Sequence, residues 1–152
     1  MLILQCVLGL QSKSIDFTNA FAQADIPSWE PVFIELPRYF NSDGGQNVVF
    51  LKLKKSLNGQ AEAACLWYEK LRNGLLERGF MVSKVDPCLF MSKTVICVVC
   101  VDDCLFWSRS ISDIDNVMKS FKEDGPSYNW EHSKGESVSE FLGIDIKTLD
   151  NG

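Results

Sequence analysis

Changes in the spacing of hydrophobic residues along the chain predict its helices and strands. Apolar residues recur at steps of three and four from Asn58 to Arg78 and from about Ser112 to Glu123, the pattern of helices with one buried face. The almost wholly apolar stretch Met1–Leu10 indicates the end of a buried helix, and Asn19–Ala24 a short helix or turn. Short apolar or alternating runs between turn residues predict strands at Lys13–Phe17, Val32–Leu36, Val48–Leu53, Phe80–Val82, Cys88–Met91, Val95–Val101, Cys104–Trp107 and Glu140–Ile146.

This order of elements favours an α+β fold, with an antiparallel sheet and helices packed on one face. The glycine-rich turn at residues 41–45 joins the second and third strands as a hairpin. Gly79 suits the end of the longer helix, because it has no Cβ to oppose a left-handed turn. Ser112 and Asp115 predict a capping box at the start of the second long helix. The buried stripe of the longer helix is predicted to contain Ala64, Trp67, Leu71 and Leu75.

Two adjacent carboxylates, Asp102 and Asp103, interrupt the apolar run that ends at Trp107. Because two charges inside a buried strand are costly, we expect a hairpin with both acids at its turn. Asp16, at the end of an earlier strand, would complete a cluster of three carboxylates, and such clusters suit hard cations such as Mg²⁺. The alternative is an ordinary turn dipeptide, since Asp tolerates turn geometry and bonds to its own backbone.

Length and charge narrow the classes of protein that fit. The 152 residues suffice for one domain with a hydrophobic core, and no apolar stretch approaches the about 20 residues that span a bilayer. Without a recognisable secretion signal, we expect an intracellular protein, cytoplasmic or nuclear, that does not enter a membrane. The net charge of −5 disfavours a self-sufficient nucleic-acid binder, which usually carries a basic patch.

The six cysteines lie in apolar or periodic segments, as free buried thiols do. Three of them, Cys97, Cys100 and Cys104, are spaced somewhat like zinc ligands. On a strand, however, Cys97 and Cys100 point to opposite faces because side chains alternate. Free thiols are therefore favoured over a zinc site or a redox centre.

Six short motifs resemble, in this order, those of the reverse transcriptase of copia-type retrotransposons. They are Ile15-Asp16-Phe17-Thr18-Asn19-Ala20-Phe21, Leu53-Lys54-Lys55-Ser56-Leu57-Asn58-Gly59, Leu66-Trp67-Tyr68-Glu69-Lys70-Leu71, Asp86-Pro87-Cys88-Leu89-Phe90, Val101-Asp102-Asp103 and Phe141-Leu142-Gly143-Ile144-Asp145-Ile146. Each motif is unspecific alone, and the order and spacing of all six carry the resemblance. It implies a polymerase palm with a ferredoxin-like core and partial fingers over residues 1–146, then a tail over residues 147–152 without a thumb.

The resemblance also implies RNA-dependent DNA polymerase activity, which is nucleotidyl transfer with two metal ions. Asp16, Asp102 and Asp103 would be the catalytic residues and the ligands of Mg²⁺ or Mn²⁺. The backbone carbonyl of Phe17 would be a further metal ligand. The implied partners are an RNA or DNA template with its primer, a deoxynucleoside triphosphate (dNTP), and the missing fingers, thumb and ribonuclease H regions of a polyprotein.

Two further groups of residues match motifs of that family. Those implied to contact the nucleotide are Phe21, Lys54, Lys55 and Gly59, and those implied to form a primer grip are Phe141, Leu142 and Gly143. Plainer alternatives exist for each: a core aromatic at Phe21, solvated side chains for the lysine pair, and an ordinary edge strand for the last motif.

Three positions depart from the family pattern. Cys100 and Asn58 stand where the family has tyrosine, and Cys65 stands where it has arginine. Each replacement is reachable by one nucleotide change, as decay of an element copy would produce. The alternative function is therefore a catalytically inert, truncated or decayed copy that persists as a folded domain or a protein-binding piece, and we expect the isolated fragment to be inactive.

Overall fold

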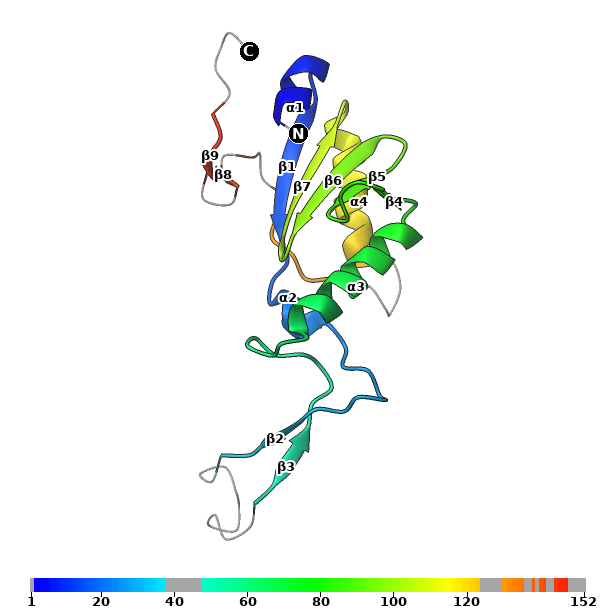
Figure 1. Ribbon diagram of the computed structural model, residues 1–152. Helices are drawn as coiled ribbons and strands as arrows, with labels where there is room; N and C mark the ends of the chain where they lie inside the picture. The colour runs from blue at the N-terminus through cyan, green and yellow to red at the C-terminus, as the bar shows by residue number, and fades with distance from the viewer. Residues whose placement is uncertain are drawn as a thin grey trace.

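Five antiparallel strands form the main sheet, in the order β1-β7-β6-β5-β4 (Figure 1). The computed structural model describes residues 2–37, 48–123, 130–135, 138, 140–141 and 144–147 of the 152. The helices are α1 (Leu2–Leu8), α2 (Ala20–Gln23), α3 (Ala63–Glu77) and α4 (Ile111–Glu123). The strands are β1 (Gln11–Asp16), β2 (Phe33–Glu35), β3 (Phe50–Lys52), β4 (Met81–Val82), β5 (Leu89–Met91), β6 (Val95–Cys100), β7 (Asp103–Ser108), β8 (Glu140–Phe141) and β9 (Ile144–Asp145). Of the helices in these ranges, none has the length and apolarity that crossing a bilayer requires.

One face of the main sheet forms the hydrophobic core together with two helices. Side chains alternate between faces along a strand, so Val95, Cys97 and Val99 of β6 share a face, and all three are buried. The α3 and α4 residues in the same buried cluster are Trp67, Leu71, Leu75, Ile114, Met118 and Phe121. The predicted α+β fold with an antiparallel sheet is therefore confirmed, and α3 and α4 lie on one face of that sheet, but the expectation that all helices share this face is wrong for α1.

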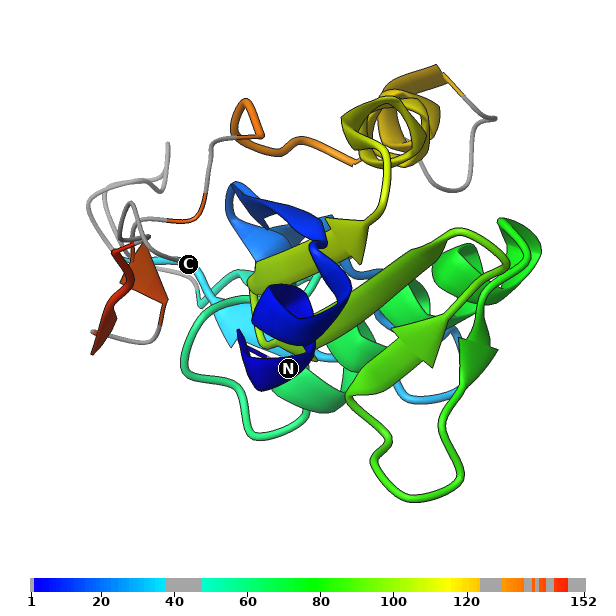
Figure 2. The same ribbon diagram turned by 90° about the horizontal axis from the view of Figure 1, so that it is seen from above.

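The opposite face of the sheet is partly covered by α1. The indole N–H of Trp107 donates to Gln5 of this helix at 2.8 Å, and the Gln5 amide donates to the Ser12 hydroxyl at 3.1 Å. In Figure 2 the strands lie between α1 and α4. The expectation that this N-terminal helix is buried is wrong, since Ile3 and Val7 are 79% and 72% exposed. A helix of one and a half to two turns presents only one side to the sheet and leaves the other in solvent.

Strands β2 and β3 pair as a separate two-stranded ribbon, as predicted, and Figure 1 shows it beyond α2, away from the main sheet. Every residue of both strands is exposed, including the aromatic rings of Phe33 and Phe50. The predicted turn at residues 41–45 lies outside the described residues. The ribbon therefore adds no side chain to the main core.

Helix α3 begins at Ala63, later than the predicted start at Asn58. The chain turns first at Gly59, whose φ of +93° belongs to the left-handed region, and the Gln60 N–H closes this turn on the Leu57 carbonyl. The later start also corrects the buried stripe, because Ala63 is buried and Ala64 is exposed.

The end of α3 follows the prediction. Gly79 has φ +81°, and its N–H donates to the Leu76 carbonyl at 2.9 Å. The next N–H, of Phe80, donates to the Leu75 carbonyl at 3.1 Å. These two bonds define a Schellman motif, which satisfies carbonyls that the helix itself leaves without partners.

Two boundary predictions near the C-terminus are wrong. Ser112 lies inside α4, which begins at Ile111, and the Asp115 carboxylate accepts a hydrogen bond from Lys13 of β1 instead of closing a capping box. The predicted single strand Glu140–Ile146 is two short strands, β8 and β9, that pair with each other. Antiparallel pairing within this segment requires the chain to reverse, which one continuous strand cannot do.

Candidate active site

The hairpin of β6 and β7 presents the tandem acids at one end of the main sheet. Cys100 and Asp103 are paired across it, so the two-residue loop is Val101-Asp102 and Asp103 belongs to β7. The predicted loop, Asp102-Asp103, is thus displaced by one residue. Val101, the first residue of the loop, has φ +55°, a conformation that hairpin loops of two residues normally give to glycine, asparagine or aspartate.

Asp16 lies directly across from this hairpin. Strand β1 pairs with β7 in a register that puts Asp16 opposite Asp103. The next N–H along β1, of Phe17, donates to the Asp102 carbonyl at 2.9 Å. The predicted proximity of Asp16 to the tandem acids is therefore confirmed. Since Ile15 points into the core, Asp16 and its partner Asp103 point from the opposite face, away from α3 and α4.

Like charges gather at this end of the sheet. Partial burial raises the pKa of Asp103, and the carboxylates of Asp102 and Asp16 raise it further. Asp16 and Asp102 themselves are exposed. A cation near these oxygens would relieve the repulsion, because it favours the ionised form of each acid.

The chemistry of these donors fits a hard divalent cation, since carboxylate oxygens are what Mg²⁺ prefers. The positions of these carboxylates, however, do not complete a metal site. Within the described part of the chain, no three His, Cys, Asp or Glu side chains converge closely enough to hold one metal ion. The site is therefore a strand-paired couple, Asp16 and Asp103, with Asp102 in the adjoining loop.

Trp67 of α3 also contacts the acidic turn, the Val101-Asp102 loop between β6 and β7, and the sequence analysis did not predict this contact. Its indole N–H donates to the Val101 carbonyl at 2.7 Å, and its side chain is 1% exposed. The helical stripe predicts that Trp67 is a core residue, which is correct. Nothing in the period of the stripe indicates that its one polar atom contacts the loop of a hairpin.

The lysine pair expected near the nucleotide divides into two environments. The Lys55 ammonium lies 2.6 Å from the Asp25 carboxylate and donates to the Gln23 carbonyl at 3.1 Å. Lys70 of α3 bonds to the same two residues. Burial opposes ionisation of Asp25, but the hydrogen bonds and charges of Lys55 and Lys70 outweigh it and lower the pKa of Asp25. Both lysines are exposed, but Lys55 is engaged in an ion pair within the fold.

The other predicted site residues lie on separate elements. Phe21 of α2 is half-buried and packs against the main core, and its carbonyl accepts a hydrogen bond from the Ser56 hydroxyl. Gly59 lies in the exposed turn before α3. Phe141 belongs to β8, and Leu142 and Gly143 lie outside the described residues. Among the predicted site residues that the structure describes, the three aspartates and Phe17 are the ones that lie together.

All six cysteines are free, as predicted, but only Cys97 and Cys104 are buried. These two are hydrogen-bonded to each other on the core face of the β6–β7 hairpin. Burial is the main reason that the pKa of Cys104 is well above its usual range. Cys100 is half-buried and lies opposite Asp103, while Cys65 is exposed on α3.

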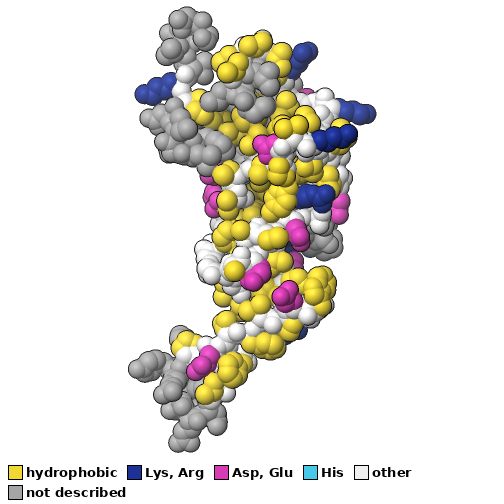
Figure 3. Space-filling view, in the orientation of Figure 1, with side chains coloured by type: hydrophobic (Ala, Val, Ile, Leu, Met, Phe, Trp, Pro, Cys, Tyr) yellow, Lys and Arg dark blue, Asp and Glu magenta, His cyan; other side chains and the backbone are white. Residues whose placement is uncertain are grey.

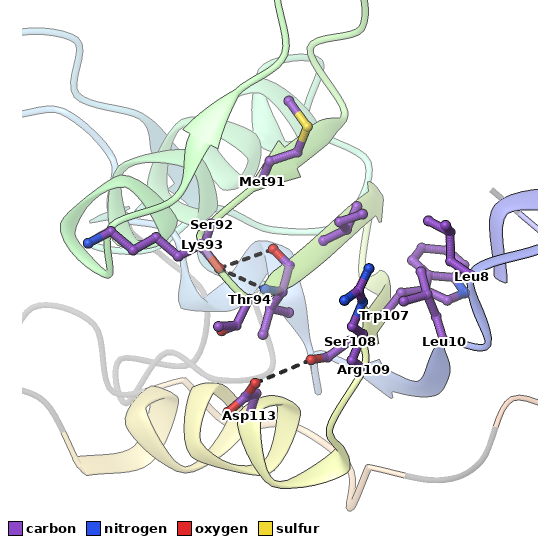
Figure 4. A pocket seen from close by; sticks show the side chains of 12 residues that line it. Leu8, Leu10, Met91, Ser92, Lys93, Thr94, Trp107, Ser108, Arg109 and Asp113 are labelled. Atoms are coloured by element: carbon purple, nitrogen blue, oxygen red, sulfur yellow. Dashed lines mark hydrogen bonds between the residues drawn. The ribbon is translucent and has the colours of Figure 1, made fainter.

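A pocket of about 460 Å³ opens at the other end of the hairpin, where β6 begins and β7 ends. Figure 4 shows it between α1, the loop before β6 and the start of α4, with hydrogen bonds from Ser92 and Ser108 to other lining residues. The Ser108 hydroxyl donates to Asp113 at 3.4 Å, and Ser92 exchanges hydrogen bonds with Val95. No pattern in the sequence indicates this pocket.

Charge on the molecular surface is uneven. On the face drawn in Figure 3, the visible Lys and Arg side chains of the described residues lie mainly in the upper half, and Asp and Glu predominate lower down. In the same orientation, Figure 1 places the acidic turn at the lower end of β6 and β7. A phosphate approaching the turn from this side would therefore meet mostly acidic groups.

Comparison with known proteins relates this sequence to a family. The profile of the family described as reverse transcriptase (RNA-dependent DNA polymerase) matches residues 2–152. The chain belongs to this reverse transcriptase family. It is 31% identical over 144 residues, 92% of its length, to the Retrovirus-related Pol polyprotein from transposon RE1 of Arabidopsis thaliana. It is 28% identical over 136 residues, 88% of its length, to the Transposon Ty1-NL2 Gag-Pol polyprotein of Saccharomyces cerevisiae.

These relatives identify the reverse transcriptase as copia-type, as the six motifs indicated. The chain is also 27% identical, over 88% of its length, to the Truncated transposon Ty1-A Gag-Pol polyprotein of the same yeast. It spans only 9%, 7% and 11% of these three relatives. Their names therefore describe proteins of which this reverse transcriptase sequence matches a small part.

Proposed function

We propose that this chain is the catalytic region of a copia-type RNA-dependent DNA polymerase, with Asp16, Asp102 and Asp103 as its catalytic residues. The observation that carries the proposal is the strand pairing of Asp16 with Asp103, from segments far apart in a sequence that matches the reverse transcriptase family. A purely structural role would not favour three like charges at one end of a sheet, because their repulsion opposes folding.

The three carboxylates and the Phe17 carbonyl would bind Mg²⁺, or Mn²⁺ in its place. When bound, the two ions lower the pKa of the primer 3′-hydroxyl and neutralise charge on the triphosphate. The protein's own contribution is positional. Pairing of β1 with β7 fixes the spacing of Asp16 and Asp103, and the Phe17 N–H fixes the Asp102 carbonyl beside them. Such preorganisation accounts for much of the catalysis in phosphoryl transfer.

The substrates would be an RNA or DNA template with its primer, and a dNTP. Phe21 and Gly59 are proposed to border the nucleotide, and Lys54 to reach its phosphates. Lys55 contributes indirectly in this scheme, because its ammonium is paired with Asp25. Phe141, Leu142 and Gly143 remain the proposed primer grip. In this scheme residues 1–146 form a palm with a ferredoxin-like core and partial fingers, and other regions of a polyprotein supply the remaining contacts.

A second candidate is a catalytically inert copy, and two observations favour it. Cys100, in place of the family's tyrosine, lies directly opposite Asp103. In addition, the described acids do not form a three-ligand group. Cysteine at position 100 removes an aromatic surface beside the catalytic turn, where a base or sugar would otherwise be contacted.

Primer extension with Mg²⁺ or Mn²⁺ separates the two candidates. The chain is assayed alone and fused to the fingers and thumb of the Ty1 relative, and the polymerase proposal predicts extension by the fused protein. Asp102→Asn should abolish it, whereas Glu69→Gln, an exposed acid on α3, should leave it unchanged. If the fused protein shows no extension even after Cys100→Tyr and Cys65→Arg, the inert candidate is correct.

A further inference from the structure

Both carbonyls of the acidic loop accept hydrogen bonds from outside the hairpin. The Val101 carbonyl accepts from the indole of Trp67 at 2.7 Å, and the Asp102 carbonyl accepts from the Phe17 N–H at 2.9 Å. In a two-residue hairpin loop these groups commonly face water. Here one carbonyl is bonded to the Trp67 side chain of α3, and the other to the N–H of Phe17, the residue that follows Asp16.

The loop needs such ties because of the conformation of Val101. Its φ of +55° is unfavourable for any residue with a Cβ, and more so for a β-branched one. Strained backbone persists only where the surrounding structure overdetermines it. The Val101 side chain is 49% exposed, so packing of its isopropyl group is not what enforces this φ. The pairing of Cys100 with Asp103 confines the loop to a tight two-residue turn, and the hydrogen bond to the Val101 carbonyl is the tertiary constraint added to it.

The two donors belong to one rigid group. Trp67 contacts the Phe17 ring edge-on, with centroids 5.2 Å apart, and contacts Trp130 at 6.2 Å. Phe17 is as deeply buried as Trp67, at 1% exposure. Aromatic packing of this kind fixes ring positions, so the distance between the two donors cannot vary much. Asp16, one residue from Phe17, moves with the same group.

We propose that Trp67 is a positioning residue, whose indole N–H holds Val101 at positive φ and thereby fixes Asp102 and Asp103 relative to Asp16. Its importance for catalysis rests on the proposed function. Its effect on the loop does not, because the conformation of Val101 is measurable without metal or substrate.

The test removes the N–H and keeps the ring. Benzothienylalanine, which has the shape of tryptophan but no indole N–H, replaces Trp67, and Trp67→Phe serves as a second variant. The scalar coupling between the amide proton and Hα of Val101 reports its φ, and Mn²⁺-induced line broadening reports metal affinity. We expect the coupling to depart from its wild-type value, because Val101 then samples other φ angles, and Mn²⁺ affinity to fall about threefold to tenfold, the effect of one lost hydrogen bond.

Two variants make this result specific. Trp107 is equally buried and its indole also donates a hydrogen bond, but to Gln5 of α1, so benzothienylalanine at position 107 should change neither readout. Adding Val101→Gly to the benzothienylalanine-67 protein should return Mn²⁺ affinity to within about twofold of wild type, because glycine adopts positive φ without help. General loosening of the core would not be rescued in this way.

Failure of this inference is distinguishable from failure of the proposed function. If the benzothienylalanine-67 protein keeps the wild-type coupling and affinity while Asp102→Asn abolishes Mn²⁺ binding, Trp67 has no positioning role and the metal site stands. If wild type does not bind Mn²⁺, the proposed metal site is wrong, and the Val101 coupling alone decides the role of Trp67.

Discussion

Replacing Val101 by glycine and by alanine should give an order of stability opposite to that found at an ordinary strand position. Both changes delete the same half-exposed isopropyl group, so the loss of burial nearly cancels in the comparison. They differ in the Cβ, which costs about 1–2 kcal/mol at left-handed φ. Glycine loses about 0.5–1 kcal/mol through its greater freedom in the unfolded chain. We therefore expect Val101→Gly to be more stable than Val101→Ala by about 0.5–1 kcal/mol.

Val98, in β6 of the same hairpin, is the matched control because it is half-buried and does not have a positive φ. There the Val98→Ala variant should be the more stable of the two by about 0.5–1 kcal/mol. Urea unfolding of the four variants measures these differences, provided that the dependence on urea concentration is the same in each. If alanine is preferred at both positions, Val101 is not strained and the argument for a constrained loop is wrong.

Three further predictions concern charge and helix termination. Asp103→Asn should stabilise the metal-free protein at neutral pH, because burial and the charges of Asp102 and Asp16 raise the pKa of Asp103. Wild type then loses stability as pH rises through that pKa, and the variant does not. The same dependence of unfolding free energy on pH in both proteins, measured with urea, would contradict this. Asp25→Asn should destabilise the protein at neutral pH and match wild type at strongly acidic pH, since Lys55 and Lys70 outweigh burial and lower the pKa of Asp25. An equal loss of stability at every pH would show that the charge of Asp25 is irrelevant. Gly79→Ala should cost about 0.5–1 kcal/mol in thermal unfolding, because strain at φ +81° exceeds what alanine gains from its smaller freedom in the unfolded chain, and no atom lies within 4 Å of the added Cβ. A cost near zero would mean that the end of α3 re-forms without the left-handed residue.

The main elements follow from the spacing of hydrophobic residues, because burial of one face imposes a period on each strand and helix. The acidic loop, by contrast, lies one residue earlier in the chain than predicted. Local turn chemistry favours Asp at positive φ and disfavours valine, whereas the structure puts Val101 there and ties its carbonyl to Trp67. A tertiary hydrogen bond thus overrides a local preference, and no local pattern contains it.

The candidate site was predictable to a similar degree. The order of the motifs correctly predicted that Asp16 and Asp103 lie close together, because the family resemblance implies which strands pair. The engagement of Lys55 was not predictable, because its partner Asp25 lies on a separate segment and the choice between solvent and an ion pair depends on a distance. The exposed face of α1 was mispredicted because an apolar composition does not say how many sides of a short helix meet a partner.

Antiparallel pairing between the first strand and the seventh has a kinetic consequence. The β6–β7 hairpin is local in sequence and closes quickly, whereas β1 must find its place across most of the chain, and the entropy of closing so large a loop makes such contacts slow. The tandem acids are therefore ordered before their third companion arrives. During synthesis on a ribosome β1 emerges before β7, so the cluster of negative charge is completed only after β7 (Asp103–Ser108) has left the ribosome.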